Sequence, residues 1–281
     1  GGWNRRCSGW WRGSVGLAGG RPDGRYFVCR DAVCPRGTVF VNGRRFPDHD
    51  HPTLPVSVDA TEALRAGDNE LAVLVSDYER DERERQKVPT GNWIPCGHSG
   101  IWQDVHLVER GAAYAEDVAI VTSTRKRTIA ASLRVANARA EARNLRVRLE
   151  VVRWQKGAAA DRLPAELHLG DGTVRLAAGG HACVDVEQAW PEAAWWSPES
   201  PVLHQLRWSI FENDRLIERG YERFGFREVW IEGPHIMLND HPIHMFSDWG
   251  HKATPYYYTE GWIRQWFGMI RDANMNHSRL H

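Results

Sequence analysis

Short segments in which apolar and polar residues alternate dominate the chain up to about residue 230. Residues 145–151 place Leu, Val, Leu and Val on one face of a strand and charged side chains on the other, and residues 206–210 repeat this alternation. Residues 38–46 predict a hairpin, because the central Asn42-Gly43 pair tolerates positive φ. Short strands separated by turns are typical of stacked antiparallel sheets.

Other segments add shorter signals to this β pattern. Asp59–Glu62 resembles a capping box that opens one turn of helix, which Gly67 would end in the left-handed conformation. Residues 70–76 and 101–109 predict strands. Turns or loops are expected at residues 78–86, 156–163, 170–172 and 213–214.

The pattern changes near residue 235. Residues 243–247 predict a strand, and residues 275–280 predict a second one. Between them, Thr259 is a possible N-cap, Asn274 would close the helix, and large apolar residues fall at helical spacing. These are Trp262, Ile263, Trp266, Phe267 and Ile270. Strand, helix and strand form a βα unit, the building block of a parallel sheet or barrel.

Composition narrows the class of protein. A chain of 281 residues predicts two or three domains. Lys+Arg and Asp+Glu both total 36, so the net charge of +0 argues against nucleic acid or an anionic membrane as the main partner. No apolar stretch approaches the roughly 20 residues of a spanning helix. Five Cys without a Cys-x-x-Cys pair indicate neither a zinc knuckle nor a disulfide framework.

Candidate chemistry is sparse. The 14 Trp residues fit sandwich cores, with a sugar platform as the functional alternative for some of them. Pro47–Pro52 has the composition of a metal site, but its His and Asp alternate along an extended chain, which favours a polar loop. Gly97–Gly100 lacks the Gly-x-Ser-x-Gly spacing of a nucleophile elbow. No phosphate-binding glycine loop is present.

The last segment carries the most suggestive polar residues. His277, Arg279 and His281 share one face if this segment is a strand. Two His side chains on one face could bind a metal, whereas polar residues at the end of a barrel strand point toward a substrate pocket. Arg offers a fixed fork of donors to hydroxyl or carboxylate oxygens. A structural polar cluster is the other interpretation, and spacing alone leaves these open.

Taken in order, segments across nearly the whole chain resemble family 2 glycoside hydrolases, the group of β-galactosidases, β-glucuronidases and β-mannosidases. The matching segments are residues 38–43, 59–73, 100–107, 196–206, 224–228, 238–243 and 274–281. His204 stands where the family usually has Tyr. The segment 246–251 departs from the commonest Gly-x-Asn-x-His form, and His281 follows Arg279 by two residues where many members have three.

The resemblance implies a mainly β fold with three parts. Residues 1–110 would form a sugar-binding jelly roll, 111–228 an immunoglobulin-like sandwich, and 229–281 the truncated start of a TIM (β/α)8 barrel. It also implies a retaining hydrolase with two catalytic Glu residues on later barrel strands, beyond His281. Glu232 and Glu260 are therefore not expected to be that pair, and the chain alone is expected to be inactive.

The residues expected to bind substrate follow from the same resemblance. They are Arg279 and His281, with Asp248 and His251 at the end of the first barrel strand. A carbohydrate is the expected partner, with neither a metal nor a cofactor. The rival class is a non-catalytic carbohydrate-binding or adhesion protein built from β-sandwiches. A sandwich-bearing protease or lyase has no supporting motif.

Overall fold

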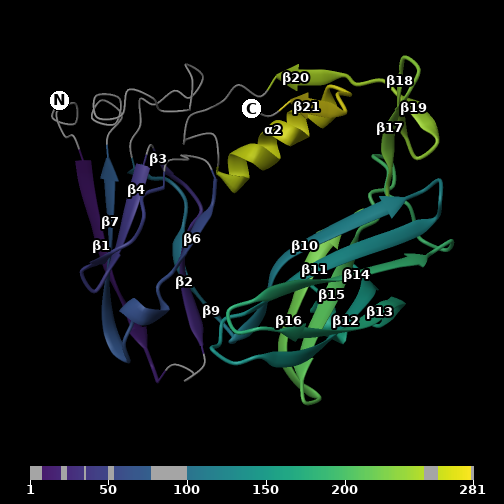
Figure 1. Ribbon diagram of the computed structural model, residues 1–281. Helices are drawn as coiled ribbons and strands as arrows, with labels where there is room; N and C mark the ends of the chain where they lie inside the picture. Colours follow the sequence, from purple (N-terminus) through teal and green to yellow (C-terminus); the bar gives the residue numbers. More distant parts are fainter. Residues whose placement is uncertain are drawn as a thin grey trace, which may run out of the picture. The chain divides into compact units, whose positions relative to one another are not determined.

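The computed structural model describes residues 8–19, 24–34, 36–49, 54–76, 100–249 and 259–279 (Figure 1). The chain divides into two compact units, one made of Gly1–Arg110 with Ser247–His281 and the other of Gly111–Phe246. Strands predominate in both, as the alternating pattern predicted. The fold is therefore mainly β.

Two antiparallel sheets form the first sandwich, drawn in purple and blue in Figure 1. The strand order is β1-β7-β4-β5 in one sheet and β6-β2-β9 in the other, and β3 pairs with β8. These strands are β1 (Ser8–Leu17), β2 (Arg25–Arg30), β3 (Val33–Cys34), β4 (Arg36–Val41), β5 (Arg44–Arg45), β6 (Val56–Asp59), β7 (Gly67–Ser76), β8 (Gly100–Ile101) and β9 (Val105–Arg110). Val28 from one sheet and Val39 and Val73 from the other are fully or almost fully buried in its core.

The hairpin around Asn42-Gly43 is confirmed. Strands β4 and β5 pair antiparallel on either side of it. Asn42 has a φ of 48° and Gly43 a φ of 82°, so both turn positions are left-handed. This is the geometry that favours Asn-Gly, because its twist matches that of the flanking strands.

The capping box expected at Asp59–Glu62 is wrong. A short 3₁₀ turn, η2 (Thr61–Ala63), begins there without a side-chain cap. Asp59 instead accepts hydrogen bonds from the backbone N–H and the hydroxyl of Thr61, at 3.0 and 2.5 Å. Gly67 has the expected left-handed φ of 83°, but it begins strand β7 rather than ending a helix.

The strand expected at residues 101–109 is divided into β8 and β9. The intervening residues bond elsewhere: the N–H of Trp102 donates to the carbonyl of Ala32, and the carbonyl of Asp104 accepts from the N–H of Asp31. Because these backbone groups bond to residues 31 and 32, the strand is interrupted between β8 and β9. The apolar pattern alone did not show this interruption.

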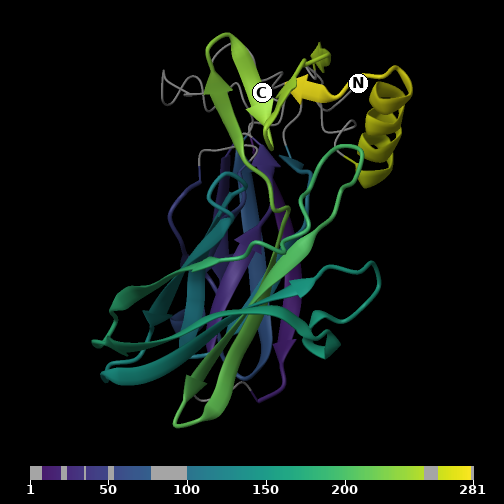
Figure 2. The same cartoon turned by 90° about the vertical axis from the view of Figure 1, so that its right-hand side faces the viewer.

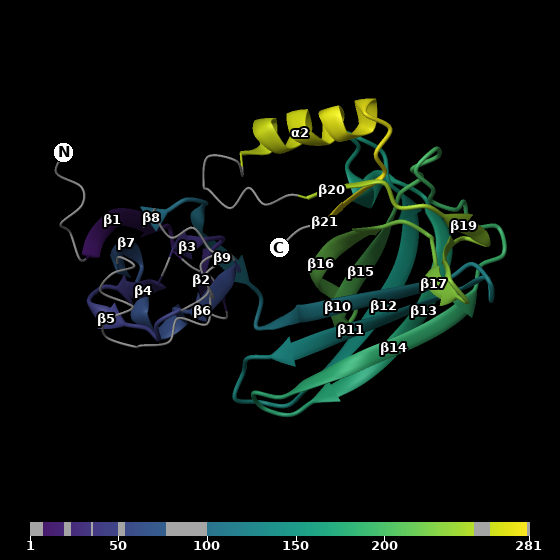
Figure 3. The same cartoon turned by 90° about the horizontal axis from the view of Figure 1, so that it is seen from above.

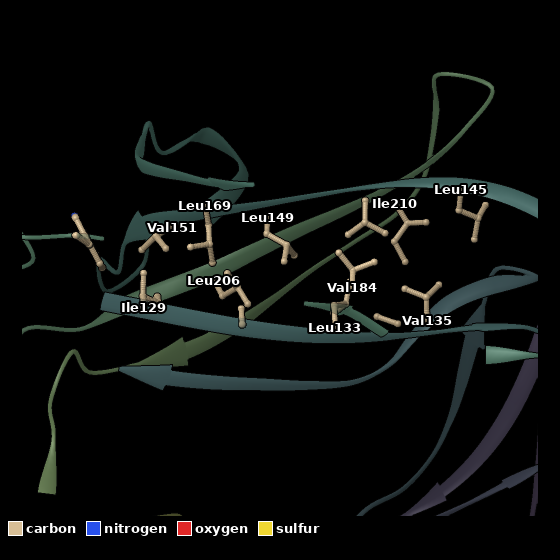
Figure 4. Packing of buried hydrophobic residues seen from close by; sticks show 14 of the residues in the cluster. Ile129, Leu133, Val135, Leu145, Leu149, Val151, Leu169, Val184, Leu206 and Ile210 are labelled. Carbon is tan, nitrogen blue, oxygen red and sulfur yellow. The ribbon is translucent and has the colours of Figure 1, made fainter. Parts of the chain in front are cut away.

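A second sandwich occupies most of Gly111–Phe246. Its sheets have the orders β10-β11-β14 and β13-β12-β15-β16. The strands are β10 (Ala113–Ser123), β11 (Thr128–Asn137), β12 (Arg143–Arg153), β13 (Ala165–Leu176), β14 (His181–Ala189), β15 (His204–Glu212) and β16 (Arg215–Phe224). Figure 4 shows Ile129 and Leu133 of one sheet facing Leu149 and Leu206 of the other, and all four are completely buried.

The turn expected at residues 170–172 is wrong, because these residues lie inside β13. Both glycines make room for side chains of β14. A Cβ on Gly172 would lie 2.5 Å from Val184, and one on Gly170 would lie 3.1 Å from Val186. The glycines therefore serve close packing between the two sheets rather than chain reversal.

Strand β15 also departs from simple alternation. Leu206 and Ile210 are buried as expected, but Arg207 and Ser209 on the opposite face are buried too. The loop expected at residues 156–163 contains a short 3₁₀ turn, η4 (Ala160–Arg162), and the Arg207 guanidinium donates to the Ala160 carbonyl at 3.2 Å. This loop covers a face that the polar pattern assigned to solvent.

A small three-stranded sheet follows the second sandwich and projects from its end (Figures 1 and 2). It consists of β17 (Val229–Glu232), β18 (His235–Leu238) and β19 (His241–Ile243) in that order. Asn239 and Asp240 form its second turn with φ values of 49° and 70°. The chain then reaches strand β20 (Ser247–Trp249), so the strand expected at residues 243–247 begins later than the sequence indicated.

Candidate functional site

Strand β20, helix α2 (Glu260–Asp272) and strand β21 (His277–Arg279) form the expected β-α-β arrangement. The two strands pair in parallel, and α2 runs alongside them (Figures 1 and 3). A parallel pair needs a crossover connection, which here contains the helix. Both strands therefore end at the same edge, where a β/α fold collects its functional residues.

Helix α2 forms where the apolar spacing predicted it. The hydroxyl of Thr259 caps it by accepting from the N–H of Trp262 at 3.3 Å. Trp266 and Ile270 are buried, and Trp262 stacks on Trp266 with ring centroids 5.5 Å apart. Asn274 follows the helix with a left-handed φ of 55°. The cap and the terminator were both foreseen from residue type.

Two of the four residues expected to bind substrate lie on this unit. Asp248 belongs to β20 and Arg279 to β21, one register position apart in the parallel pair. His251 and His281 lie outside the described residues. The structure thus brings together the backbones of Asp248 and Arg279, which are 31 residues apart by number in the chain.

Strand β21 also carries polar atoms that lack partners. His277 Nδ1 and Ser278 Oγ are buried and have no hydrogen-bond partner within the described part of the chain. Buried polar groups are nearly always paired, and each unpaired one destabilises the fold. Because consecutive residues of a strand point to opposite faces, these two atoms lie on opposite sides of β21.

The metal interpretation of Pro47–Pro52 gains no support. Asp48 accepts hydrogen bonds from Thr38 and Arg45, both at 2.7 Å. Burial alone would raise the pKa of Asp48, but these bonds and the charges of Arg45 and Arg36 outweigh it and lower the pKa. Among the described residues no three His, Cys, Asp or Glu side chains are grouped to hold a metal ion. Residues 50–52 lie outside the described ranges.

The Gly97–Gly100 segment falls largely outside the described residues as well, with only Gly100 placed, in β8. The charged loop expected at residues 78–86 also lies outside them. The described helices include none that is long and apolar enough to cross a membrane.

Asn42 and Asn69, which belong to two of the family-like segments, have a structural role in the first sandwich. Asn69 is almost completely buried, and its amide donates to the carbonyls of Arg65 and Gly67 at 2.7 and 2.9 Å. Its oxygen accepts from the amide of Asn42 at 2.8 Å, which also donates to the Ala63 carbonyl. The motif residues around positions 42 and 69 therefore join two turns through buried hydrogen bonds.

Glu228 anchors the start of the three-stranded sheet to the second sandwich. Its carboxylate accepts hydrogen bonds from the side chains of Arg125 and Ser123, and its N–H donates to Asn239 at 2.9 Å. The hydrogen bond from Arg125 is the main cause that lowers the pKa of Glu228 to about 2. The guanidinium of Arg125 also lies 4.4 Å from the ring centroid of Trp230.

The neighbouring Gly-Phe-Arg segment packs around one indole. A Cβ on Gly225 would lie 2.8 Å from Trp196, so only glycine fits beneath that side chain. Phe226 is completely buried, and Arg227 lies over the Trp196 ring at 4.5 Å. This junction is thus built for close packing rather than for catalysis.

Sequence reasoning missed the Arg125–Glu228 contact. The available signal was weak: Arg125-Lys126-Arg127 is a basic turn between two strands, and Glu228 directly follows the Gly-Phe-Arg segment. Their separation of 103 residues cannot be bridged from local pattern alone.

The same fold occurs in solved glycosidase structures. A β-glucuronidase from Bacteroides uniformis superposes with a TM-score of 0.81 over 98% of this chain and 33% of its own, at 19% identity. A β-galacturonidase from Eisenbergiella tayi gives 0.79 over 98% of this chain and 45% of its own, at 21% identity. At such identities the likeness concerns the fold.

Sequence comparison finds similar proteins as well. Residues 113–227 match the model of Glycosyl hydrolases family 2. A β-galactosidase from Leuconostoc mesenteroides is 27% identical over 86% of this chain. A putative β-glucuronidase from Formosa agariphila is 24% identical over 85% of it. The chain is thus similar to glycoside hydrolase family 2 proteins over most of its length, and it spans 23% and 22% of the lengths of these two relatives.

Proposed function

We propose that this chain is the front part of a retaining β-glycosidase. Residues 1–110 would be its jelly roll, 111–228 its immunoglobulin-like sandwich and 229–281 the start of its TIM barrel. The observation that carries the proposal is the parallel pairing of β20 with β21 across helix α2, because a parallel pair with a crossover helix is the repeating unit of a β/α barrel. A purely β-sandwich binding or adhesion protein has no use for such a unit.

In this proposal the chemistry belongs to two carboxyl groups carried by later strands. Retention requires them to stand about 5 to 5.5 Å apart, one as nucleophile and the other as acid and then base. Glu232 lies in β17, and Glu260 begins α2 with its exposed carboxylate paired to Arg264. Neither is on a strand of the β/α unit, so neither is assigned a catalytic role.

The residues of this chain would contribute to substrate binding. Arg279 and His281 would donate hydrogen bonds to sugar oxygens, with Asp248 and His251 at the end of the first strand. Asp248 and Arg279 lie near the ends of neighbouring parallel strands, where Asp248 is aligned with Ser278 and Arg279 with Trp249. The Nδ1 atom of His277 in β21, which has no hydrogen-bond partner among the described residues, is a further polar atom on that strand. No metal or cofactor enters this proposal.

Chromogenic substrates test the proposal. The longer gene product that contains this chain is incubated with 4-nitrophenyl β-galactoside, β-glucuronide, β-mannoside and β-galacturonide. We expect hydrolysis of at least one with retention of the anomeric configuration, and no turnover by the purified 281-residue chain alone. Inversion, a gene product without a barrel after residue 281, or turnover by the isolated chain would each overturn it.

A further inference from the structure

Strand β2 places a charged side chain in the interior of the first sandwich. Tyr26, Val28 and Arg30 are buried and alternate with less buried residues along this strand, so they share its inner face. Val28 belongs to the hydrophobic core, and Arg30 follows it on the same face with only 1% of its surface exposed. Because a guanidinium stays protonated in proteins, this face of β2 buries a positive charge.

One nitrogen of the Arg30 guanidinium is bound to the backbone. Its Nη1 donates to the carbonyl of Gly37 in β4 at 2.7 Å. The packing is close here, because a Cβ on Gly37 would lie 2.8 Å from this Nη1 and 2.8 Å from Cγ1 of Val33. Glycine at position 37 therefore makes room for the guanidinium, and the hydrogen bond holds it in place.

The opposite edge of the guanidinium is formed by Nε and Nη2. Both atoms are buried, and neither has a hydrogen-bond partner among the described residues. The N–H groups of such an edge donate side by side in one plane, which matches the two oxygens of a carboxylate. Arg125 uses the same edge within this chain, since its Nε and Nη2 both donate to the carboxylate of Glu228.

Asp48 is the acidic residue whose charge acts on Arg30. Burial lowers the pKa of the Arg30 guanidinium, and the charge of Asp48 partly offsets this effect. The carboxylate of Asp48, however, accepts hydrogen bonds from Thr38 and Arg45, both at 2.7 Å, and from Arg36 at 3.5 Å. It makes no hydrogen bond to Nε or Nη2 of Arg30. The described part of the chain therefore supplies no carboxylate to this edge.

The chemistry of the site favours one class of partner. A buried charge without a counter-charge is strongly destabilising, and water would satisfy the two N–H groups without neutralising the guanidinium. A phosphate or sulfate would bring more than one negative charge into surroundings that include the buried Val28 and Val33, at a high cost in dehydration. A monocarboxylate neutralises the single positive charge and accepts both hydrogen bonds in plane.

We propose that the Nε–Nη2 edge of Arg30 binds one small free monocarboxylate, of the size of acetate, inside the first sandwich. The site goes beyond the proposed hydrolase function, because binding there breaks no bond. Its consequence is for stability: an ion that binds the folded chain but not the unfolded one raises the free energy of unfolding as its concentration rises.

Urea denaturation of the 281-residue chain at neutral pH tests the proposal, with sodium acetate replacing sodium chloride at constant ionic strength. Because Arg30 is almost completely buried, complete unfolding and refolding gives the ion access to its site. We expect the urea midpoint of the wild type to rise with the logarithm of the acetate concentration. The midpoint of Arg30→Met should not. Arg30→Lys keeps the charge but lacks the planar fork, so it should lose most of the response.

Arg44→Met is the matched control, because Arg44 is more than half exposed and pairs with Glu62 at 3.2 Å in the same sandwich. It should keep the wild-type response to acetate. Sodium phosphate is the comparison salt, and it should shift the wild type and Arg30→Met equally, since its exclusion from protein surfaces is a general effect. Circular dichroism confirms that each variant folds.

Three results would overturn the proposal. The first is a wild-type midpoint that acetate does not raise, and the second is an equal rise in the wild type and Arg30→Met. The third is a rise that depends on Arg30 in phosphate but not in acetate, because the anion would then belong to another class. The test measures stability alone, so its failure leaves the proposed hydrolase function untouched, and the reverse also holds.

Discussion

The Nδ1 atom of His204 lies 2.9 Å from a carboxylate oxygen of Glu166, although the His204 side chain is completely buried. Its Nε2 lies 3.1 Å from the carbonyl of Ala194. The buried ring therefore makes a polar contact at each of its two nitrogens. Arg153 donates to the other oxygen of Glu166 at 2.9 Å, which holds that carboxylate in place.

Replacing His204 with Phe should therefore destabilise the second sandwich by about 3 kcal/mol. Phe keeps the edge contact with Trp190, whose ring centroid is 4.9 Å away, but removes both hydrogen bonds. Urea denaturation followed by tryptophan fluorescence measures the loss. His204→Tyr introduces the residue that family 2 glycoside hydrolases usually have at this position. It should lower the free energy of unfolding less than His204→Phe does, because the Tyr hydroxyl would keep one hydrogen bond.

His168→Phe is the matched control for this prediction. His168 is 53% exposed and its contact with Asp171 spans 3.5 Å. Such a pair is expected to change stability by less than about 1 kcal/mol. A His204→Phe variant as stable as the control would contradict the structural role assigned to the buried imidazole.

The Glu228 carboxylate predicts a dependence of stability on pH. Its pKa falls from 4.5 to about 2 on folding, chiefly through the hydrogen bond from Arg125. A depressed pKa contributes stability that is fully present above the unfolded value and is lost as the pH falls through the folded value. The urea midpoint of the wild type should therefore fall between pH 4.5 and about 2 more steeply than that of Glu228→Gln.

Other carboxylates titrate in the same pH range. The measurement is therefore the difference between the wild type and Glu228→Gln in how the urea midpoint depends on pH. Glu116→Gln serves as the control, because Glu116 is 43% exposed in its pair with Arg134. Its curve should follow that of the wild type. Parallel curves for the wild type and Glu228→Gln would show that the contact with Arg125 does not stabilise the folded state.

Gly220 lies against the indole of Trp208. A Cβ on Gly220 would be 2.1 Å from Cζ2 of Trp208, which no small adjustment relieves. Gly220→Ala should destabilise the second sandwich by about 2 kcal/mol or more. Gly13→Ala, at a strand position with nothing within 4 Å of the added Cβ, should be neutral or slightly stabilising.

A double variant isolates the steric cause. Trp208→Leu removes the clashing ring, so Gly220→Ala should cost much less in that background than in the wild type, as measured by a double-mutant cycle. If Gly220→Ala lowered the free energy of unfolding equally in the wild type and in Trp208→Leu, its effect would come from backbone conformation rather than from a clash with the indole.

The local sequence pattern was sufficient to predict much of the fold. Asn42-Gly43 predicted its hairpin, and Thr259 with the apolar spacing through Ile270 predicted helix α2, because caps, turns and amphipathic faces depend on neighbouring residues. Gly170 and Gly172 were mistaken for turn residues. Glycine is needed at these positions because side chains of β14, which is distant in sequence, pack closely against them. Arg207 was assigned to solvent for the same reason: a distant loop covers it.

The candidate site was accessible from sequence only through the family resemblance. Spacing placed Arg279 on a strand but left metal binding, substrate binding and a structural cluster equally open. The parallel pairing with Asp248 became visible only in three dimensions, because residues 250–276 separate the two strands. The ring contact between Trp10 and Phe40 was likewise hidden, since the two residues meet across a third strand.

Substitution of Arg279 tests the proposed substrate pocket most directly. If the longer gene product is the proposed glycosidase, Arg279→Ala should lower its kcat/KM by roughly 10- to 100-fold, because the proposed charge-assisted hydrogen bond to a sugar oxygen would be lost. Thermal unfolding should remain that of the wild type. Arg271→Ala is the control, since the Arg271 side chain is 82% exposed on helix α2 and pairs with Asp272. If Arg279→Ala and Arg271→Ala have the same kcat/KM as the wild type, Arg279 does not contact the substrate, and the strand ends of β20 and β21 do not form the pocket.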